Sequence, residues 1–98
     1  MNDNEQHPVS LIVGRVRRQK GGPAEGVQIM LVAPDDDSAV RRALDALLKE
    51  GYAEAELDRI GEMEEIPDEE PHLSAFQGAL EGEVSIITFQ LGDGQLDD

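Results

Sequence analysis

The chain has 98 residues, of which 39% are hydrophobic and 31% charged, and its formal net charge is −14. This length allows one domain with a single core and is too short for a large internal cavity. The absence of cysteine excludes disulfides, thiol catalysis and zinc–thiolate sites. No apolar run approaches the roughly 20 residues of a membrane-spanning helix, and the polar first residues do not resemble a signal peptide. We therefore expect a soluble, cytoplasmic protein.

The charge is concentrated in the second half of the chain. Residues 1–50 hold seven bases and eight acids, whereas residues 51–98 hold one base and fourteen acids. An acidic half repels phosphate backbones and anionic membranes, so direct binding to nucleic acid or to a membrane is disfavoured. A basic protein is the favoured kind of partner, and the chain itself is expected to be a monomer or a homodimer.

The ends of the chain, residues 1–8 and 92–98, are polar and acidic and are expected to be flexible tails. Residues 9–91 are expected to form a single domain. Val9–Arg18 and Val27–Ala33 are rich in β-branched and apolar residues, which predicts two strands. The loop between them carries three glycines and a proline, so the two strands are expected to form an antiparallel hairpin.

A helix is predicted after Pro34. One of Asp35 to Asp37 is expected to cap its start, and Gly51 is placed to end it in the left-handed conformation. The apolar residues at helical spacing are expected to face the core, and they are Val40, Leu44, Leu47 and Leu48. The polar residues between them are expected to face water, and they are Arg41, Arg42, Asp45 and Lys49.

The segment from Tyr52 to Ile66 admits two interpretations. As a helix, it would place Ala53, Leu57, Ile60 and Met63 on one face, and its residues are good helix formers. As a strand, it would alternate small apolar residues with carboxylates. No capping residue follows Gly51, and a bulge near Ile60–Gly61 would explain why the alternation changes there. We therefore predict a strand.

A second helix is predicted after Pro67, with Asp68 as a possible cap and Leu73, Phe76 and Leu80 on its apolar face. Gly78 inside this helix indicates close packing on the sheet. Val84–Leu91 is apolar on both sides, which favours a strand in the interior of the sheet.

The order of elements is therefore β-β-α-β-α-β, and the fold class is α+β. Strand–helix–strand units usually form right-handed crossovers between parallel strands. We therefore expect a two-layer sandwich: a four-stranded mixed sheet with two helices mainly on one face.

The candidate site is the acidic row of the third strand and its continuation. In a strand, Glu54, Glu56 and Asp58 would project from one face about 7 Å apart, a spacing that suits lysine and arginine side chains of a partner. The other interpretation is an edge strand whose charges keep it from pairing with another chain. The predicted partner-binding residues are Glu54, Glu56, Asp58, Glu62 and Glu64.

Other polar groups offer weaker candidates. The run Asp35-Asp36-Asp37 lacks the spacing of a calcium loop, and the cluster of Glu69, Glu70 and His72 has no second nearby histidine to complete a metal site. No serine lies in a Gly-x-Ser-x-Gly context. The basic residues are expected to pair with acids of this chain or of a second copy, and they are Arg15, Arg17, Arg18 and Lys20. We predict no catalytic residue, metal ion or cofactor.

Three functions are consistent with these patterns. The first is a non-catalytic interaction protein, such as an adaptor, an inhibitor or an immunity-type subunit, whose acidic half binds a basic partner. The second is a small-ligand binding or sensory domain, possibly dimeric, with a pocket between sheet and helices. The third is an enzyme that relies on carboxylates, which the poor supply of catalytic groups disfavours.

Overall fold

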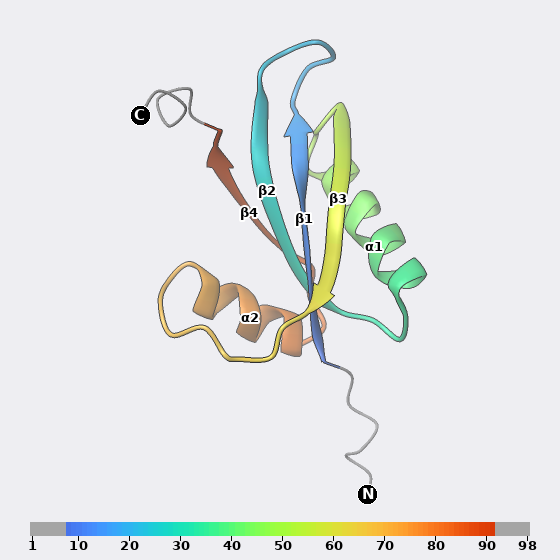
Figure 1. Cartoon of the computed structure of the whole chain (residues 1–98). Helices are drawn as coiled ribbons and strands as arrows, with labels where there is room; N and C mark the ends of the chain where they lie inside the picture. The colour runs from blue at the N-terminus through green and yellow to red at the C-terminus, as the bar shows by residue number, and fades with distance from the viewer. Residues whose placement is uncertain (1–7, 92–98) are drawn as a thin grey trace, which may run out of the picture.

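A computed structural model describes residues 8–91 of the chain, so the tails expected at 1–8 and 92–98 lie outside the described residues apart from Pro8. The elements follow the predicted order (Figure 1): β1 (Val9–Arg17), β2 (Ala24–Val32), α1 (Asp36–Lys49), β3 (Glu54–Glu62), α2 (His72–Leu80) and β4 (Ser85–Gln90). The α+β class and the β-β-α-β-α-β order are confirmed.

The sheet has the strand order β3-β1-β2-β4, and every neighbouring pair is antiparallel. The mixed sheet that we expected is therefore wrong. The first strand–helix–strand unit does connect two parallel strands, because β2 and β3 both run antiparallel to β1. However, β1 lies between them: it pairs with β2 along one side and with β3 along the other. The second unit connects β3 and β4, which lie at opposite edges.

The two helices contact opposite faces of the sheet, and not mainly one face as the sequence suggested. Ile29 of β2 packs in one core with Ala43 of α1, whereas the next residue, Met30, packs in a second core with Phe76 of α2. Successive side chains of a strand point to opposite faces, so α1 and α2 lie on either side of the sheet. Figure 1 shows the two helices on opposite sides of the strands, α1 on the right and α2 at the lower left.

Helix α1 covers the larger core. Its start is capped by Asp35, whose carboxylate accepts a hydrogen bond of 2.8 Å from the backbone N–H of Ser38. This bond from the Ser38 backbone holds the pKa of the Asp35 carboxyl below its ordinary value. Gly51 ends the helix with φ 98°, as predicted. The buried side chains of α1 are Ala39, Ala43 and Leu47.

The predicted apolar face of α1 was only partly right. Leu47 is fully buried and Val40 half-buried, but Leu44 is 42% and Leu48 69% exposed. The alanines lie closest to the sheet because their small side chains let the helix approach it, and this leaves the neighbouring leucines beyond the edge of the core.

Helix α2 covers the smaller core with Ala75, Phe76 and Ala79. Its N-cap residue is Pro71, which has no capping side chain, and not the predicted Asp68. The preceding residue, Glu70, accepts hydrogen bonds from the backbone N–H and the hydroxyl of Ser74 in the first turn, at 3.1 and 2.8 Å. Gly78 does mark a close approach, since a Cβ there would lie 2.9 Å from the Ser85 hydroxyl oxygen at the start of β4.

Strand β3 confirms the extended interpretation of the Tyr52–Ile66 segment from Glu54 to Glu62. It contains the expected irregularity, but three residues earlier than Gly61. Leu57 pairs with Gly14 and Arg59 with Val13, which leaves Asp58 as the additional residue of a β-bulge. The bulge lets both Leu57 and Ile60 pack against the core under α1.

Strand β4 lies at an edge of the sheet, and not in its interior. The sequence suggested an interior strand because β4 is apolar on both sides. The structure gives another reason why β4 is apolar on both sides: Ile86 packs against the core under α1 and Ile87 against the core under α2. An edge strand between two helix-covered faces therefore has the same pattern as a central strand.

Candidate partner-binding surface

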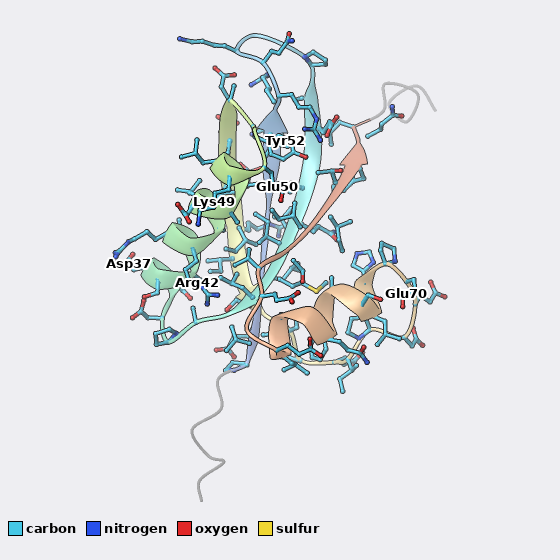
Figure 2. The ribbon with its side chains drawn as sticks, turned by 180° about the vertical axis from the view of Figure 1, so that it is seen from behind. Asp37, Arg42, Lys49, Glu50, Tyr52 and Glu70 are labelled. Atoms are coloured by element: carbon cyan, nitrogen blue, oxygen red, sulfur yellow. The ribbon has the colours of Figure 1, made fainter. Side chains whose placement is uncertain are left out.

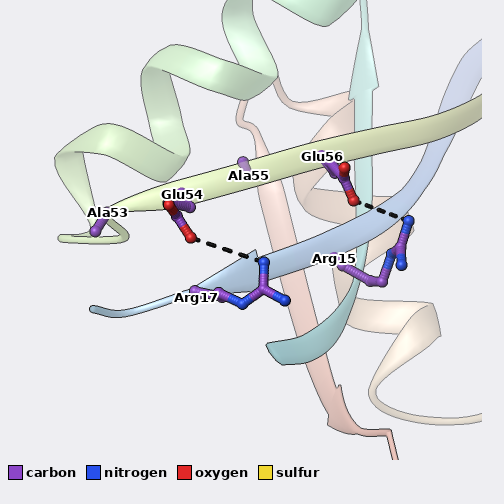
Figure 3. A pocket seen from close by; sticks show the side chains of 6 residues that line it. All are labelled: Arg15, Arg17, Ala53, Glu54, Ala55 and Glu56. Atoms are coloured by element: carbon purple, nitrogen blue, oxygen red, sulfur yellow. Dashed lines mark ion pairs between the residues drawn. The ribbon is translucent and has the colours of Figure 1, made fainter. Parts of the chain in front are cut away.

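The acidic row of β3 lies directly beside two arginines of β1. The sheet register places Glu56 opposite Arg15 and Glu54 opposite Arg17. The Arg15 guanidinium lies 2.8 Å from the Glu56 carboxylate, and that of Arg17 lies 3.7 Å from the Glu54 carboxylate (Figure 3). These side chains are 37 to 66% exposed, so solvent screens the pairs and each contributes little to stability.

Asp58 joins the same ion-pair group through the bulge. Its carboxylate oxygen lies 3.4 Å from the Nη2 atom of Arg15, the same nitrogen that contacts Glu56. The structure therefore brings together Glu54, Glu56 and Asp58 as the sequence predicted, but it interleaves them with cations. The row has two arginines for three carboxylates and is much less anionic than an isolated acidic strand.

Glu62 and Glu64 lie apart from this row. Glu62 is the last residue of β3, opposite Ser10, and Glu64 follows it in the connection to α2. Both are exposed, and within residues 8–91 neither makes an ion pair. The carboxylates that continue the sequence beyond them are also exposed. We call this group the acidic connector; it consists of Glu62, Glu64, Glu65, Asp68, Glu69 and Glu70.

The acidic connector borders an open depression at the end of the sheet. The depression is lined by Leu11 of β1 and by the chain from Glu62 to Asp68. Ile66, in the middle of the connector, is 68% exposed, and Met63 is half-buried against the core under α2. The surface therefore combines several unpaired carboxylates with one exposed apolar side chain.

The basic residues near the β1–β2 turn are largely used within the chain, as expected for Arg15 and Arg17. The sequence did not reveal the contact of Arg18. Its guanidinium lies over the ring of Tyr52, 4.5 Å from the ring centroid, and its Nη2 atom donates to the Tyr52 hydroxyl at 3.1 Å. Tyr52, labelled in Figure 2, is a buried member of the core under α1, so the contact joins the end of β1 to that core.

The cluster of Glu69, Glu70 and His72 does not form a common site. Glu70 accepts from Ser74, whereas the Nε2 atom of His72 lies 2.6 Å from the side-chain oxygen of Gln28 on β2. In the part of the chain that the structure describes, no three His, Cys, Asp or Glu side chains converge in a way that could hold a metal ion.

A depression between α1 and β3 is the place where a small-ligand domain would need its pocket. It is lined by residues of both elements and of the turn between them, and these are Leu44, Leu47, Leu48, Tyr52, Ala53, Glu54 and Ala55. Its volume is 220 Å³, below the roughly 300 to 1,000 Å³ of typical ligand pockets.

Neither helix in the described residues is long and apolar enough to cross a membrane. Comparison of the chain with protein-family models, with curated proteins and with solved structures found no match.

Proposed function

We propose that this chain is a non-catalytic protein-interaction module, such as an adaptor, an inhibitor or an immunity-type subunit, that binds a basic partner through its acidic second half. The acidic connector is the observation that carries the proposal. From Glu62 to the end of the chain there is no lysine or arginine, and the connector carboxylates are exposed. The proposal keeps the cytoplasmic location expected from the sequence.

The predicted binding residues contribute unequally in this proposal. Arg15 and Arg17 offset much of the field of Glu54, Glu56 and Asp58, so a basic partner would have to compete with cations already present. Glu62 and Glu64 have no such competitor among the described residues. We therefore assign the main electrostatic attraction to the connector and a smaller contribution to the row on β3.

The chemistry of this surface suits association rather than catalysis. Clustered exposed carboxylates accelerate the encounter with a basic surface, and the encounter becomes slower as salt screens the charges. Ile66 supplies an apolar contact at the centre of the connector, and the burial of such a side chain in an interface adds affinity that salt does not remove. We expect Glu62, Glu64 and Glu65 to surround this contact as a charged rim.

The test is an affinity purification at about 50 and about 300 mM KCl, a range over which screening increases strongly. Three forms of the chain are compared: the wild type, E62Q/E64Q/E65Q, and E50Q/E81Q/E83Q. The last two each lose three negative charges, at different positions, and all six positions are exposed. We expect the wild type and E50Q/E81Q/E83Q to retain a basic protein at low salt and E62Q/E64Q/E65Q to lose most of it.

A further variant, E54Q/E56Q/D58N, measures the contribution of the row on β3. We expect it to weaken binding less than E62Q/E64Q/E65Q does. The proposal is wrong if no protein is retained, if the retained protein is acidic, or if retention is the same in both salt concentrations. Equal loss in E62Q/E64Q/E65Q and E50Q/E81Q/E83Q would show that the effect belongs to net charge and not to the connector.

A further inference from the structure

The two edges of the sheet differ in how they are protected from pairing with another strand. The β3 edge carries five charged side chains and a bulge at Asp58. Charged residues and bulges are the features by which natural edge strands avoid adding a further strand. The β3 edge is therefore built to remain unpaired.

The β4 edge has none of these features. Its residues Ser85–Gln90 read SIITFQ, without a charge or a proline. Its register with β2 is regular from Ser85 to Gln90, so no bulge turns it away from a neighbour. Within residues 8–91 no strand pairs with its outer side (Figure 1). Alternate N–H and C=O groups of such a strand point away from the sheet and are free to bond an additional strand.

The side chains of β4 are incompletely covered on both faces of the sheet. Ile86 and Ile87 are half-buried at the margins of the two cores, and Phe89 and Leu91 are 42% and 45% exposed. The ring of Phe89 lies over Gly26 of β2, where a Cβ would come within 2.2 Å of it. One more strand beside β4 would cover apolar side chains on both faces at once.

Charge indicates what that strand is. The chain as a whole has a net charge of −14, so two copies repel each other over most of their surfaces. The region from Pro71 to Leu91 contains only two acids, Glu81 and Glu83, and no lysine or arginine. A basic partner would gain little from an uncharged strand, whereas a second copy can approach closely only at such a place.

We propose that β4 is the interface of a homodimer, in which the β4 strands of two copies pair antiparallel about a two-fold axis perpendicular to the sheet. This arrangement is isologous, so each strand supplies the same backbone groups and side chains to the other. The sheet continues across both copies, Ile86 faces apolar side chains on the α1 side, and Ile87 faces them on the α2 side. This interface is separate from the acidic connector and does not depend on the proposed partner.

Helix α2 adds to the same interface. It lies over β2 and β4 on one face of the sheet and, apart from His72, carries no ionisable side chain. The two-fold axis places the α2 helices of both copies on the same face, one on each side of the β4 junction. A specific interface needs about 1,000 Å² or more of buried surface, and the helices enlarge the area that one pair of strands provides.

Opposite salt dependence distinguishes this interface from partner binding. Salt screens the repulsion between two chains of like charge, so dimerisation strengthens as KCl is raised. Binding of a basic partner to the connector weakens over the same range.

The first experiment measures the mass of the full chain in solution, by sedimentation or light scattering, from about 1 μM to about 1 mM, which spans tight to weak association. We expect a dimer whose dissociation constant rises at least about tenfold in Thr88→Glu, because each copy then brings a new negative charge into the uncharged junction of the two strands. The matched control is Ala55→Glu on the β3 edge, which is also an exposed edge position and which leaves the dimer unchanged.

The second experiment uses the absence of cysteine from the chain. Single cysteines at positions 86 to 89 of β4 and at position 55 of β3 are oxidised, and the disulfide-linked dimer is quantified. An antiparallel junction about a two-fold axis places one β4 residue opposite its own copy, within the Cα separation of about 7 Å that a disulfide allows. We therefore expect a maximum at one position of β4 and no cross-link at position 55.

A wild-type chain that stays monomeric up to the highest concentration overturns the proposal. So does a dimer that survives Thr88→Glu, that Ala55→Glu dissociates, or that cross-links through position 55. None of these outcomes affects the partner-binding proposal, because that proposal is tested with different residues and predicts the opposite salt dependence.

Discussion

Arg42 shows how one side chain can connect elements that lie far apart in the sequence. Its Nη1 atom donates to the Val32 carbonyl at 2.6 Å, and its Nη2 atom donates to the Gly82 carbonyl at 3.2 Å (Figure 2). The guanidinium of α1 thus satisfies carbonyl groups at the end of β2 and in the turn before β4. The helical pattern suggested that Arg42 faces water like its neighbour Arg41, which remains exposed. The spacing of residues in a helix cannot show which long polar side chain will find a carbonyl on another element.

Removing Arg42 is expected to destabilise the fold. Arg42→Ala leaves the carbonyls of Val32 and Gly82 without these charged donors, so we expect the free energy of unfolding to fall by roughly 1 to 3 kcal/mol. The control Arg41→Ala removes the same charge from an exposed neighbour and should change it by less than about 0.5 kcal/mol. Urea denaturation followed by circular dichroism measures both. Equal destabilisation of the two variants would assign the effect to charge and not to the hydrogen bonds.

At the level of elements, the sequence predicted what depends on local chemistry. Asp35 and Gly51 mark the ends of α1 because capping needs only nearby residues. The extended conformation of β3 also followed from local signals, chiefly the lack of a cap after Gly51. The edge position of β3 was one of the two interpretations of its charges, and the strand order agrees with it. The edge position of β4 did not follow, because the alternation of apolar residues reports burial on each face and contains no information about neighbouring strands.

The candidate site, like the fold, was predicted in its local features and not in its contacts between distant strands. Alternation placed Glu54 and Glu56 on one face of a strand, which is correct. The ion pairs with Arg15 and Arg17 depend on the register between β1 and β3, and residues so far apart in the sequence could not be aligned from their pattern alone. The main electrostatic attraction could therefore be assigned to the acidic connector, and not to the β3 row, only from the three-dimensional structure.

The bulge in β3 depends on Gly14. A Cβ at this position would lie 2.1 Å from the Glu56 carbonyl oxygen and 2.9 Å from the Leu57 Cα, both of them backbone atoms that cannot rotate away. Gly61 of β3 is different, since a Cβ there would meet nothing within 4 Å, and its φ is not positive. The β1–β3 pair thus contains one glycine that the packing requires, Gly14 of β1, and one that it does not, Gly61 of β3.

We expect Gly14→Ala to lower the free energy of unfolding by about 1 to 3 kcal/mol or more, because the β1–β3 pairing must shift to admit the methyl group. Gly61→Ala should be neutral, or stabilising by up to about 1 kcal/mol, because alanine reduces the entropy of the unfolded chain. Chemical denaturation of both variants provides the comparison. A Gly14→Ala variant as stable as Gly61→Ala would mean that β1 and β3 do not approach as closely at the bulge as the structure shows.

At the scale of the whole molecule, the charge layout separates into a balanced and an unbalanced part. The β1–β3 face interleaves arginines with carboxylates, whereas the acidic connector repeats one sign. Repulsion within the connector opposes the compact state. The same residues that we propose for partner binding should therefore limit stability, which is a common conflict between a binding surface and the fold that carries it.

This conflict predicts how stability responds to salt. Raising KCl from about 10 to about 500 mM reduces the screening length from about 30 Å to a few ångströms, so we expect the melting temperature of the wild type to rise. E62Q/E64Q/E65Q should melt higher than the wild type at low salt and gain less from added salt, since part of the repulsion is already removed. E54Q/E56Q/D58N should not share this gain, because it leaves Arg15 and Arg17 without their carboxylate partners. Thermal unfolding at a protein concentration low enough to keep the chain monomeric measures all three proteins. If both triple variants are stabilised to the same degree at low salt, the connector and the β3 row are electrostatically equivalent, and the division between a balanced and an unbalanced acidic surface is wrong.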